Sequence, residues 1–168
     1  AAPHINKPYK SAKLKKIILS LVIIVAVSLS ILFSLLALQK DTFTYTKLDD
    51  GTYEFTSFSN TGFITEVDID YYCEIVYDKD NPDPETNFTI KKDKSKPITS
   101  IREYAFNCDE KVKVINIGAS VTEIDAASFY SCWALQRIEV DENNPNYCDI
   151  DGVLYNKDKS MEIMACYE

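Results

Sequence analysis

The feature that most limits the possible folds is an internal repeat of 23 residues, which begins at residue 98. Residues 98–120 align with residues 121–143 without a gap. Six apolar pairs coincide in this alignment: Ile98 with Val121, Ile101 with Ile124, Phe106 with Phe129, Val112 with Leu135, Ile115 with Ile138, and Ile117 with Val140. A period of about 20–29 residues with such a sparse apolar skeleton is typical of leucine-rich-repeat arrays, whose small units share a core with their neighbours.

Each repeat ends in an apolar alternation, VKVINI in one copy and LQRIEV in the next. Residues two apart share one face of a strand, so the pattern predicts one short strand per repeat, paired in parallel with the next. The EYAF and AASF segments favour a short helix or turn on the opposite side, with phenylalanine pointing inward. Val67-x-Ile69 has the pattern of the same strand in an earlier repeat, followed by an insertion over 71–96.

The outward positions of these strands form the predicted binding face. By alternation they are Val114 and Asn116 in one repeat, and Arg137 and Glu139 in the next. Strand faces of repeat proteins are frequent binding surfaces. The alternative is that these side chains are simply solvated.

The region before the repeats predicts a β leader. Asp50-Gly51 lies between two strand-like segments and suits a hairpin turn, because glycine accepts positive φ. Residues 78–97 are polar, charged and contain prolines, which predicts an exposed loop. Asn87 begins an Asn-Phe-Thr glycosylation sequon in this loop, which matters only in a eukaryotic secretory pathway.

The tail leaves the 23-residue period. GVLY and MEIM flank NKDKS, which predicts a second hairpin. No polar terminating repeat follows, and an uncapped array exposes its core. We therefore expect the natural protein to continue beyond Glu168.

The repeats resemble a known family. The pattern Phe129-x-x-Cys132-x-x-Leu135-x-x-Ile138-x-Val140 is similar to the BspA-like leucine-rich repeat of bacterial and protist surface proteins. NPNYCDIDGVLYNKDKS resembles the element that interrupts such arrays, and YTKLDDGTYEFTSF resembles their leader hairpin. In two places the chain departs from the family pattern: Cys108 follows Phe106 by two residues rather than three, and Gly118 and Asp141 stand where proline is common. The resemblance implies a β-rich solenoid displayed at a cell surface, with adhesion to proteins or other cells among its functions.

Residues 17–38 form an apolar run without charge, proline or glycine. As a helix the run spans about 33 Å, enough for a bilayer core of about 30 Å. A signal peptide has a shorter apolar core and a small-residue cleavage site, whereas Ala37 has Leu35 two positions before it. We predict a retained transmembrane helix; a cleaved signal peptide and a buried helix of a soluble core are the alternatives.

The charges flanking this run predict its orientation. The tail over 1–16 carries five lysines and no acid, and basic residues favour the cytoplasmic side. The remainder holds 13 basic and 26 acidic residues, a net charge of −13, and would lie outside the cell. Such acidity argues against a nucleic-acid partner.

The residue types argue against catalysis and metal binding. The single histidine, His4, falls in the basic tail, which removes a histidine-containing triad, dyad or zinc site from the outer part. DIDG at 149–152 fails as a calcium loop because its first position would be Tyr147. The acidic segment over 78–85 is better explained as a solvated loop than as a cation site. We predict no enzyme activity, cofactor or metal.

The cysteines predict packing rather than chemistry. They form no C-x-x-C motif, and Cys132 occupies an inward position of the repeat skeleton. We favour a small buried filler for Cys132, with a disulfide as the alternative; Cys108 in the adjacent repeat is the candidate partner. The five cysteines are Cys73, Cys108, Cys132, Cys148 and Cys166.

Together these patterns predict a β-rich leucine-rich-repeat solenoid with α/β-type coils, a leader hairpin and one transmembrane helix. The expected organisation is a cytoplasmic tail (1–16), a membrane helix (17–38), a leader with a polar loop (39–97) and BspA-like repeats (98–168). The expected function is non-catalytic binding of an extracellular protein or glycan, in adhesion. The alternatives are a signalling-receptor ectodomain and the non-catalytic part of a larger surface hydrolase.

Overall fold

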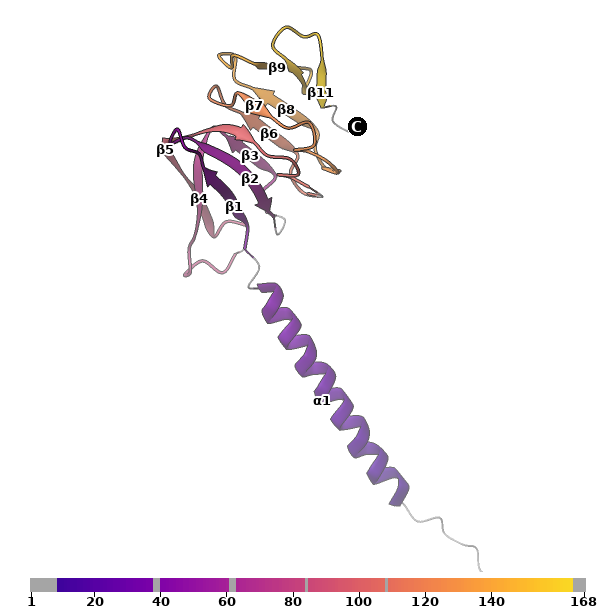
Figure 1. The fold of residues 1–168 in the computed structure, drawn as a ribbon. Helices are drawn as coiled ribbons and strands as arrows, with labels where there is room; N and C mark the ends of the chain where they lie inside the picture. Colours follow the sequence, from indigo (N-terminus) through magenta and orange to yellow (C-terminus); the bar gives the residue numbers. More distant parts are fainter. Residues whose placement is uncertain (1–8, 38–39, 61–62, 84, 108, 165–168) are drawn as a thin grey trace, which may run out of the picture. The chain divides into compact units, whose positions relative to one another are not determined.

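The computed structural model describes residues 9–37, 40–60, 63–83, 85–107 and 109–164 (Figure 1). The chain divides into two compact units, Ala1–Gln39 and Lys40–Glu168. The first contains helix α1 (Tyr9–Ala37). The second contains β1 (Thr42–Lys47), β2 (Tyr53–Ser59), β3 (Glu66–Ile69), β4 (Tyr71–Tyr77), β5 (Phe88–Ile101), β6 (Val114–Ile117), β7 (Glu123–Ile124), β8 (Arg137–Val140), β9 (Tyr147–Ile150), β10 (Val153–Asn156) and β11 (Glu162–Met164).

Helix α1 contains a stretch, Leu14–Leu32, that is long and apolar enough to cross a bilayer. The helix begins earlier than the predicted span, so residues 9–16 of the expected tail are helical. Lysine is a good helix former, so the lysines of the tail do not end the helix. Leu38, the last residue of the predicted span, lies outside the described residues. The hydroxyls of Ser20, Ser28 and Ser30 donate to main-chain carbonyls one turn earlier, at 2.8–2.9 Å. In the hydrocarbon core of a bilayer there is no water, so polar groups have to form their hydrogen bonds within the protein.

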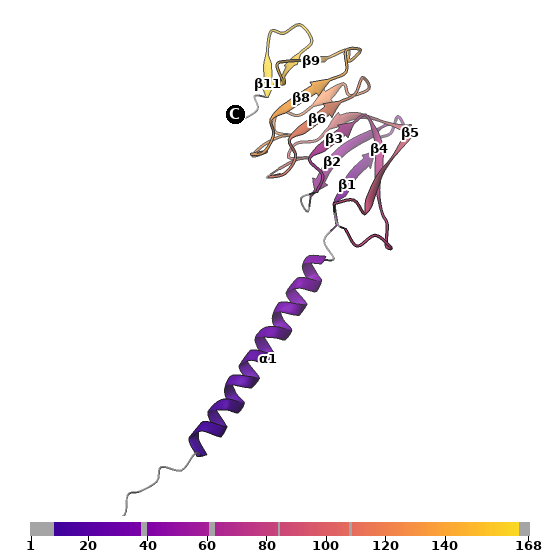
Figure 2. The same ribbon diagram turned by 180° about the vertical axis from the view of Figure 1, so that it is seen from behind.

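Two ladders of parallel strands organise the second unit (Figure 2). One contains β3, β6 and β8, and the other contains β2, the end of β5, and β7. The chain therefore makes three successive turns, which we call coil 1 (53–69), coil 2 (98–117) and coil 3 (121–140), and each contributes one strand to each ladder. The predicted parallel strands are confirmed, as is the place of Val67-x-Ile69 in an earlier coil. Ile115 pairs in register with both Val67 and Ile138.

Phenylalanine rings stack through the core from coil to coil. Phe106 lies 5.1 Å from Phe55 and 5.8 Å from Phe129 between ring centroids. All three side chains are fully buried or nearly so. Cys132 is also buried in this core, and its thiol donates a hydrogen bond to the carbonyl of Phe106 at 3.0 Å. Its predicted role in packing fits this position, whereas Cys108 and Cys166 lie outside the described residues.

The side of each coil that carries the inward phenylalanine is built from turns. Residues 103–107 and 126–131 form turns, and the described residues of the second unit contain no helix. The expectation of α/β-type coils is therefore wrong. In coil 3 the carboxylate of Asp125 accepts the Ala127 N–H at 2.8 Å, a contact that favours a turn over a helix.

The predicted loop over 78–97 is only partly a loop. Residues 88–97 form the first part of β5, which pairs antiparallel with β4, and the same strand then enters the parallel ladder. Phe88 and Ile90 supply the alternation of a strand, and their half-buried side chains pack against the core. The alternation was missed in the sequence because the neighbouring lysines make the segment polar overall. Asn87 lies directly before β5, with a half-buried side chain; its glycosylation stays a prediction.

The tail forms a third sheet, in the order β11-β10-β9. The predicted hairpin between β10 and β11 is confirmed. Leu154 is fully buried in the shared core, and the Ile138 N–H donates to the Gly152 carbonyl at 2.8 Å. The tail therefore covers the edge of coil 3, contrary to the expectation that this edge leaves the core exposed.

Two glycines with positive φ give a matched test of how closely this tail packs. Gly152 has φ +84°, and an added Cβ would lie 2.6 Å from the Cβ of Arg137; Gly51 has φ +87°, with nothing within 4 Å of an added Cβ. We expect Gly51→Ala to lower the free energy of unfolding by about 1 kcal/mol through backbone strain alone. Gly152→Ala should cost about 2 kcal/mol, because overpacking is added. Urea titration of the two variants checks this difference, and equal costs would contradict close packing of the tail on β8.

Candidate binding surface on the β3-β6-β8 ladder

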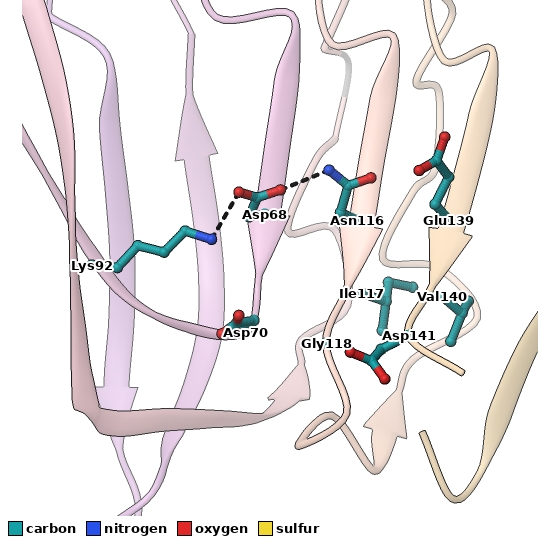
Figure 3. A pocket seen from close by; sticks show the side chains of 9 residues that line it. All are labelled: Asp68, Asp70, Lys92, Asn116, Ile117, Gly118, Glu139, Val140 and Asp141. Carbon is teal, nitrogen blue, oxygen red and sulfur yellow. Dashed lines mark hydrogen bonds and ion pairs between the residues drawn. The ribbon is translucent and has the colours of Figure 1, made fainter. Parts of the chain in front are cut away.

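The outward residues of β3, β6 and β8 form a polar surface that we call the strand face. It consists of two rows in register across the three strands. The residues directly after the strands extend it, and Figure 3 shows this extension together with the second row. Parallel pairing places these side chains side by side because residues in register share a face. The first row is Glu66, Val114 and Arg137; the second is Asp68, Asn116 and Glu139; the extension is Asp70, Gly118 and Asp141.

All four predicted face residues occupy outward positions of the ladder, and three of them are accessible to solvent. Arg137 and Glu139 are exposed, and Asn116 is half-buried. Val114 is the exception, because its side chain is only 7% exposed. It sits on the central strand between Glu66 and Arg137, and such long side chains can cover a short one. Val114 is therefore a poor contact for a ligand.

A hollow of about 300 Å³ opens at the carboxyl end of the strand face. Gly118 lines its centre, and an added Cβ there would lie 2.5 Å from the Cβ of Asp70. The missing side chain therefore allows adjacent coils to approach closely. The hollow is lined by Asp68, Asp70, Lys92, Asn116, Ile117, Gly118, Glu139, Val140 and Asp141.

Hydrogen bonds hold the upper wall of this hollow in one arrangement. The Asn116 amide donates to Asp68 at 2.7 Å and to Glu66 at 2.8 Å. Lys92, from the β4-β5 hairpin, pairs with the other oxygen of Asp68 at 2.8 Å. Arg137 pairs with Glu139 at 2.6 Å along β8. The wall is thus preorganised before any ligand arrives.

Acceptors outnumber donors in the hollow. The amide nitrogen of Asn116 donates to two carboxylates, so the amide oxygen remains available as an acceptor. Among the described residues, the buried Oδ1 atoms of Asn116 and Asp70 have no hydrogen-bond partner. Four carboxylates face one lysine in the lining. The chemistry suits a ligand that offers donors, such as ammonium, guanidinium or hydroxyl groups. The described residues include no group of three or more His, Cys, Asp or Glu placed to hold a metal ion.

Two neighbouring acids of the hollow have opposite pKa shifts. Partial burial opposes ionisation of Asp68, but hydrogen bonds from Lys92 and Asn116 outweigh it and lower its pKa below the ordinary 3.8. For Asp70, burial outweighs the attraction of Lys92 and raises the pKa above 3.8. Ionised Asp68 therefore stabilises the fold, and ionised Asp70 destabilises it.

Replacing each acid by asparagine should separate these effects. At pH 7 we expect Asp68→Asn to lower the free energy of unfolding by roughly 0.2–1 kcal/mol, because the lost ion pair is partly exposed. Asp70→Asn should raise it. The benefit of Asp70→Asn should vanish as the pH falls through the raised pKa to below 3.8, whereas the cost of Asp68→Asn should persist to lower pH. Urea unfolding midpoints of both variants, measured across this pH range, test the prediction. If both substitutions changed the stability in the same direction at pH 7, the assigned pKa shifts would be contradicted.

Several residues of the hollow were missed by sequence reasoning. Asp68 had a usable signal, since it lies between the inward residues Val67 and Ile69 and so shares the outward face. Asp70 and Asp141 each lie one step further along the same alternation, directly after β3 and β8. Lys92 had no local signal, because it reaches the hollow only through the unpredicted β4-β5 hairpin.

Short parallel strands that stack from coil to coil, with a shared apolar core, define a strand-rich fold of the leucine-rich-repeat type. The family comparison narrows this class. The family described as BspA type Leucine rich repeat region matches residues 81–156. Residues 81–156 therefore match BspA-type leucine-rich repeats, as the repeat pattern had indicated.

One solved structure is similar to the chain. It is a leucine rich cell surface protein from Faecalibacterium prausnitzii A2-165, with 21% identity and a TM-score of 0.40. The match covers 64% of this chain and 25% of that protein, so the chain spans about a quarter of its length. No curated protein gives a significant match.

Proposed function

We propose that this chain is a single-pass membrane protein that displays a leucine-rich-repeat solenoid outside the cell. Its N-terminus lies in the cytoplasm, and α1 anchors it. The apolar stretch Leu14–Leu32 supports the anchor. The lysine-rich, acid-free tail supports the orientation.

The repeat region acts as a non-catalytic binding module in adhesion. The observation that carries this proposal is the strand face, where hydrogen-bonded polar side chains from three coils border one open hollow. Preorganised side chains lose little entropy on binding, which favours affinity. The ligand is an extracellular protein or glycan whose donor groups enter the hollow.

The test uses the full chain displayed on cells and two probe sets, a glycan array and purified extracellular-matrix proteins. The face variant combines Asn116→Ala with Glu139→Ala. The control variant combines Thr89→Ala with Lys91→Ala, two exposed positions of the β4-β5 hairpin. We expect the face variant to bind the selected probe at least about tenfold more weakly and the control to bind like the parent. Unchanged binding by the face variant, or equal loss in both, would show that the strand face is not the site.

A further inference from the structure

A second hollow lies on the other ladder, over β2, the end of β5, and β7. Its volume is about 610 Å³, and it shares no lining residue with the hollow of the strand face. The strands beneath it are parallel, and Ser100 pairs in register with Glu54 on one side and with Glu123 on the other. Side chains from all three coils therefore meet there. We call it the acid hollow, because four of its lining residues are acids.

The acids of this hollow are only partly neutralised. Its single cation, Arg102, pairs with Glu54 at 3.1 Å. One oxygen of Asp125 accepts a main-chain N–H of its own turn at 2.8 Å. The carboxylates of Glu103 and Glu123 are exposed, and neither forms a hydrogen bond or ion pair with another described residue. The hollow therefore has an excess of negative charge and of hydrogen-bond acceptors.

Ser100 provides a buried polar atom at the centre of the acid hollow. The residue is only 8% exposed, yet it lines the hollow between the two glutamates with which it pairs. Among the described residues, its hydroxyl has no hydrogen-bond partner. A buried hydroxyl without a partner costs free energy, which a ligand that completes its hydrogen bonding would recover. Asn116, at the centre of the other ladder, differs because its amide already donates to two carboxylates.

We propose that the acid hollow binds the ammonium group of a lysine side chain presented by a partner protein. The Ser100 oxygen accepts one N–H of this group, and the carboxylates of Glu103 and Glu123 accept the others and balance its charge. An ammonium group suits the hollow better than a guanidinium group, because its three donors diverge and the three acceptors come from separate positions in two coils. Acids alone are ordinary on so acidic a surface; the buried hydroxyl between them is what marks this place as a site.

The first arm of the test follows amide chemical shifts by NMR in the full chain in detergent micelles. The probe is a blocked Gly-Lys-Gly tripeptide, and the control is the same peptide with an acetylated lysine side chain, which carries no charge. We expect saturable shifts of the Ser100 and Glu123 amides with the probe, which weaken as salt is added, and none with the control. Equal shifts with both peptides would overturn the proposal. Butylammonium that binds as tightly as the probe would also overturn it, because the hollow would then take any free amine.

The second arm compares variants of the same protein. Ser100→Ala should bind the probe about tenfold more weakly, since it removes a hydrogen bond to a charged group. It should not lower the free energy of unfolding, because the hydroxyl has no partner to lose in the free protein. Ser57→Ala, at an exposed serine of β2 outside the hollow, should bind like the parent. Lower stability with unchanged binding in Ser100→Ala would show a purely structural role and contradict the site.

Charge variants complete the test. Glu123→Gln should weaken binding of the probe by about tenfold, because it removes a charge that faces the ammonium group. Glu110→Gln removes the same charge at an exposed position outside the hollow and should change little. The face variant should bind the probe like the parent, so a failure of the strand face would leave this site untouched. Equal weakening by the two charge variants would mean that only the overall charge of the protein attracts the probe, and would overturn the proposal.

Discussion

Replacing Phe106 with alanine is expected to lower the free energy of unfolding by about 3–5 kcal/mol, the largest effect of any change proposed for this chain. Phe106 is fully buried and stacks between Phe55 in coil 1 and Phe129 in coil 3. A cavity there removes contacts to two neighbouring coils at once. A single coil cannot bury its own apolar face, so the loss should propagate through the unit.

The measurement is a urea titration of the full chain in micelles, followed by intrinsic fluorescence. Phe63→Ala is the matched control, since it makes the same chemical change at a side chain that is 40% exposed. We expect the control to cost less than about 1 kcal/mol. Similar midpoints for the two variants would contradict a core shared between coils.

The second large effect concerns Asn144, a polar side chain that is 1% exposed. Its amide donates to the carbonyls of Gly118 and Val121 at 2.8 and 2.9 Å. Its oxygen accepts the N–H groups of Asn146 and Tyr147 at 3.0 and 2.9 Å. Asn144 thus ties the tail to the turn between coils 2 and 3.

We expect Asn144→Ala to cost about 3–4 kcal/mol, because main-chain groups that it satisfies lose a partner in a buried place. Asn143→Ala is the control. That residue is exposed and bonds only within its own turn, to Asp141. Its removal should cost less than about 1 kcal/mol. Thermal unfolding of the two variants tests this difference. A small and equal decrease in the melting temperature of both would mean that other contacts hold the tail.

The repeat pattern predicted the ladder because strand register follows from side-chain alternation. Ile115 and Ile117 could only face the core together, and the same logic placed Val67 and Ile69 in coil 1. This alternation also placed Arg137 and Glu139 outside. It failed for Val114, since alternation gives the direction of a side chain but not what its neighbours cover.

The β4-β5 hairpin could not be read from local composition. Its lysines and prolines resemble a solvated loop, and its strands are held by pairing with each other and by contacts with β1 far away in the sequence. The position of Lys92 in the hollow depends on this hairpin. Non-local contacts of this kind leave no periodic signal in the residues that make them.

The flanking sequence separates the functional alternatives. Further repeats beyond Glu168 would support adhesion, and a catalytic domain there would support the surface hydrolase. A kinase-like domain before Ala1 would support a signalling receptor. In each case the strand face would remain the proposed binding surface, now within a larger molecule.

The most direct test of display outside the cell is protease treatment of intact cells that make the chain with a different epitope tag at each end. The proposed topology predicts that protease removes the C-terminal tag and digests residues 40–164, while the N-terminal tag stays on a short membrane-bound fragment. Protection of both tags until the cells are lysed, or loss of the N-terminal tag alone, would contradict the account.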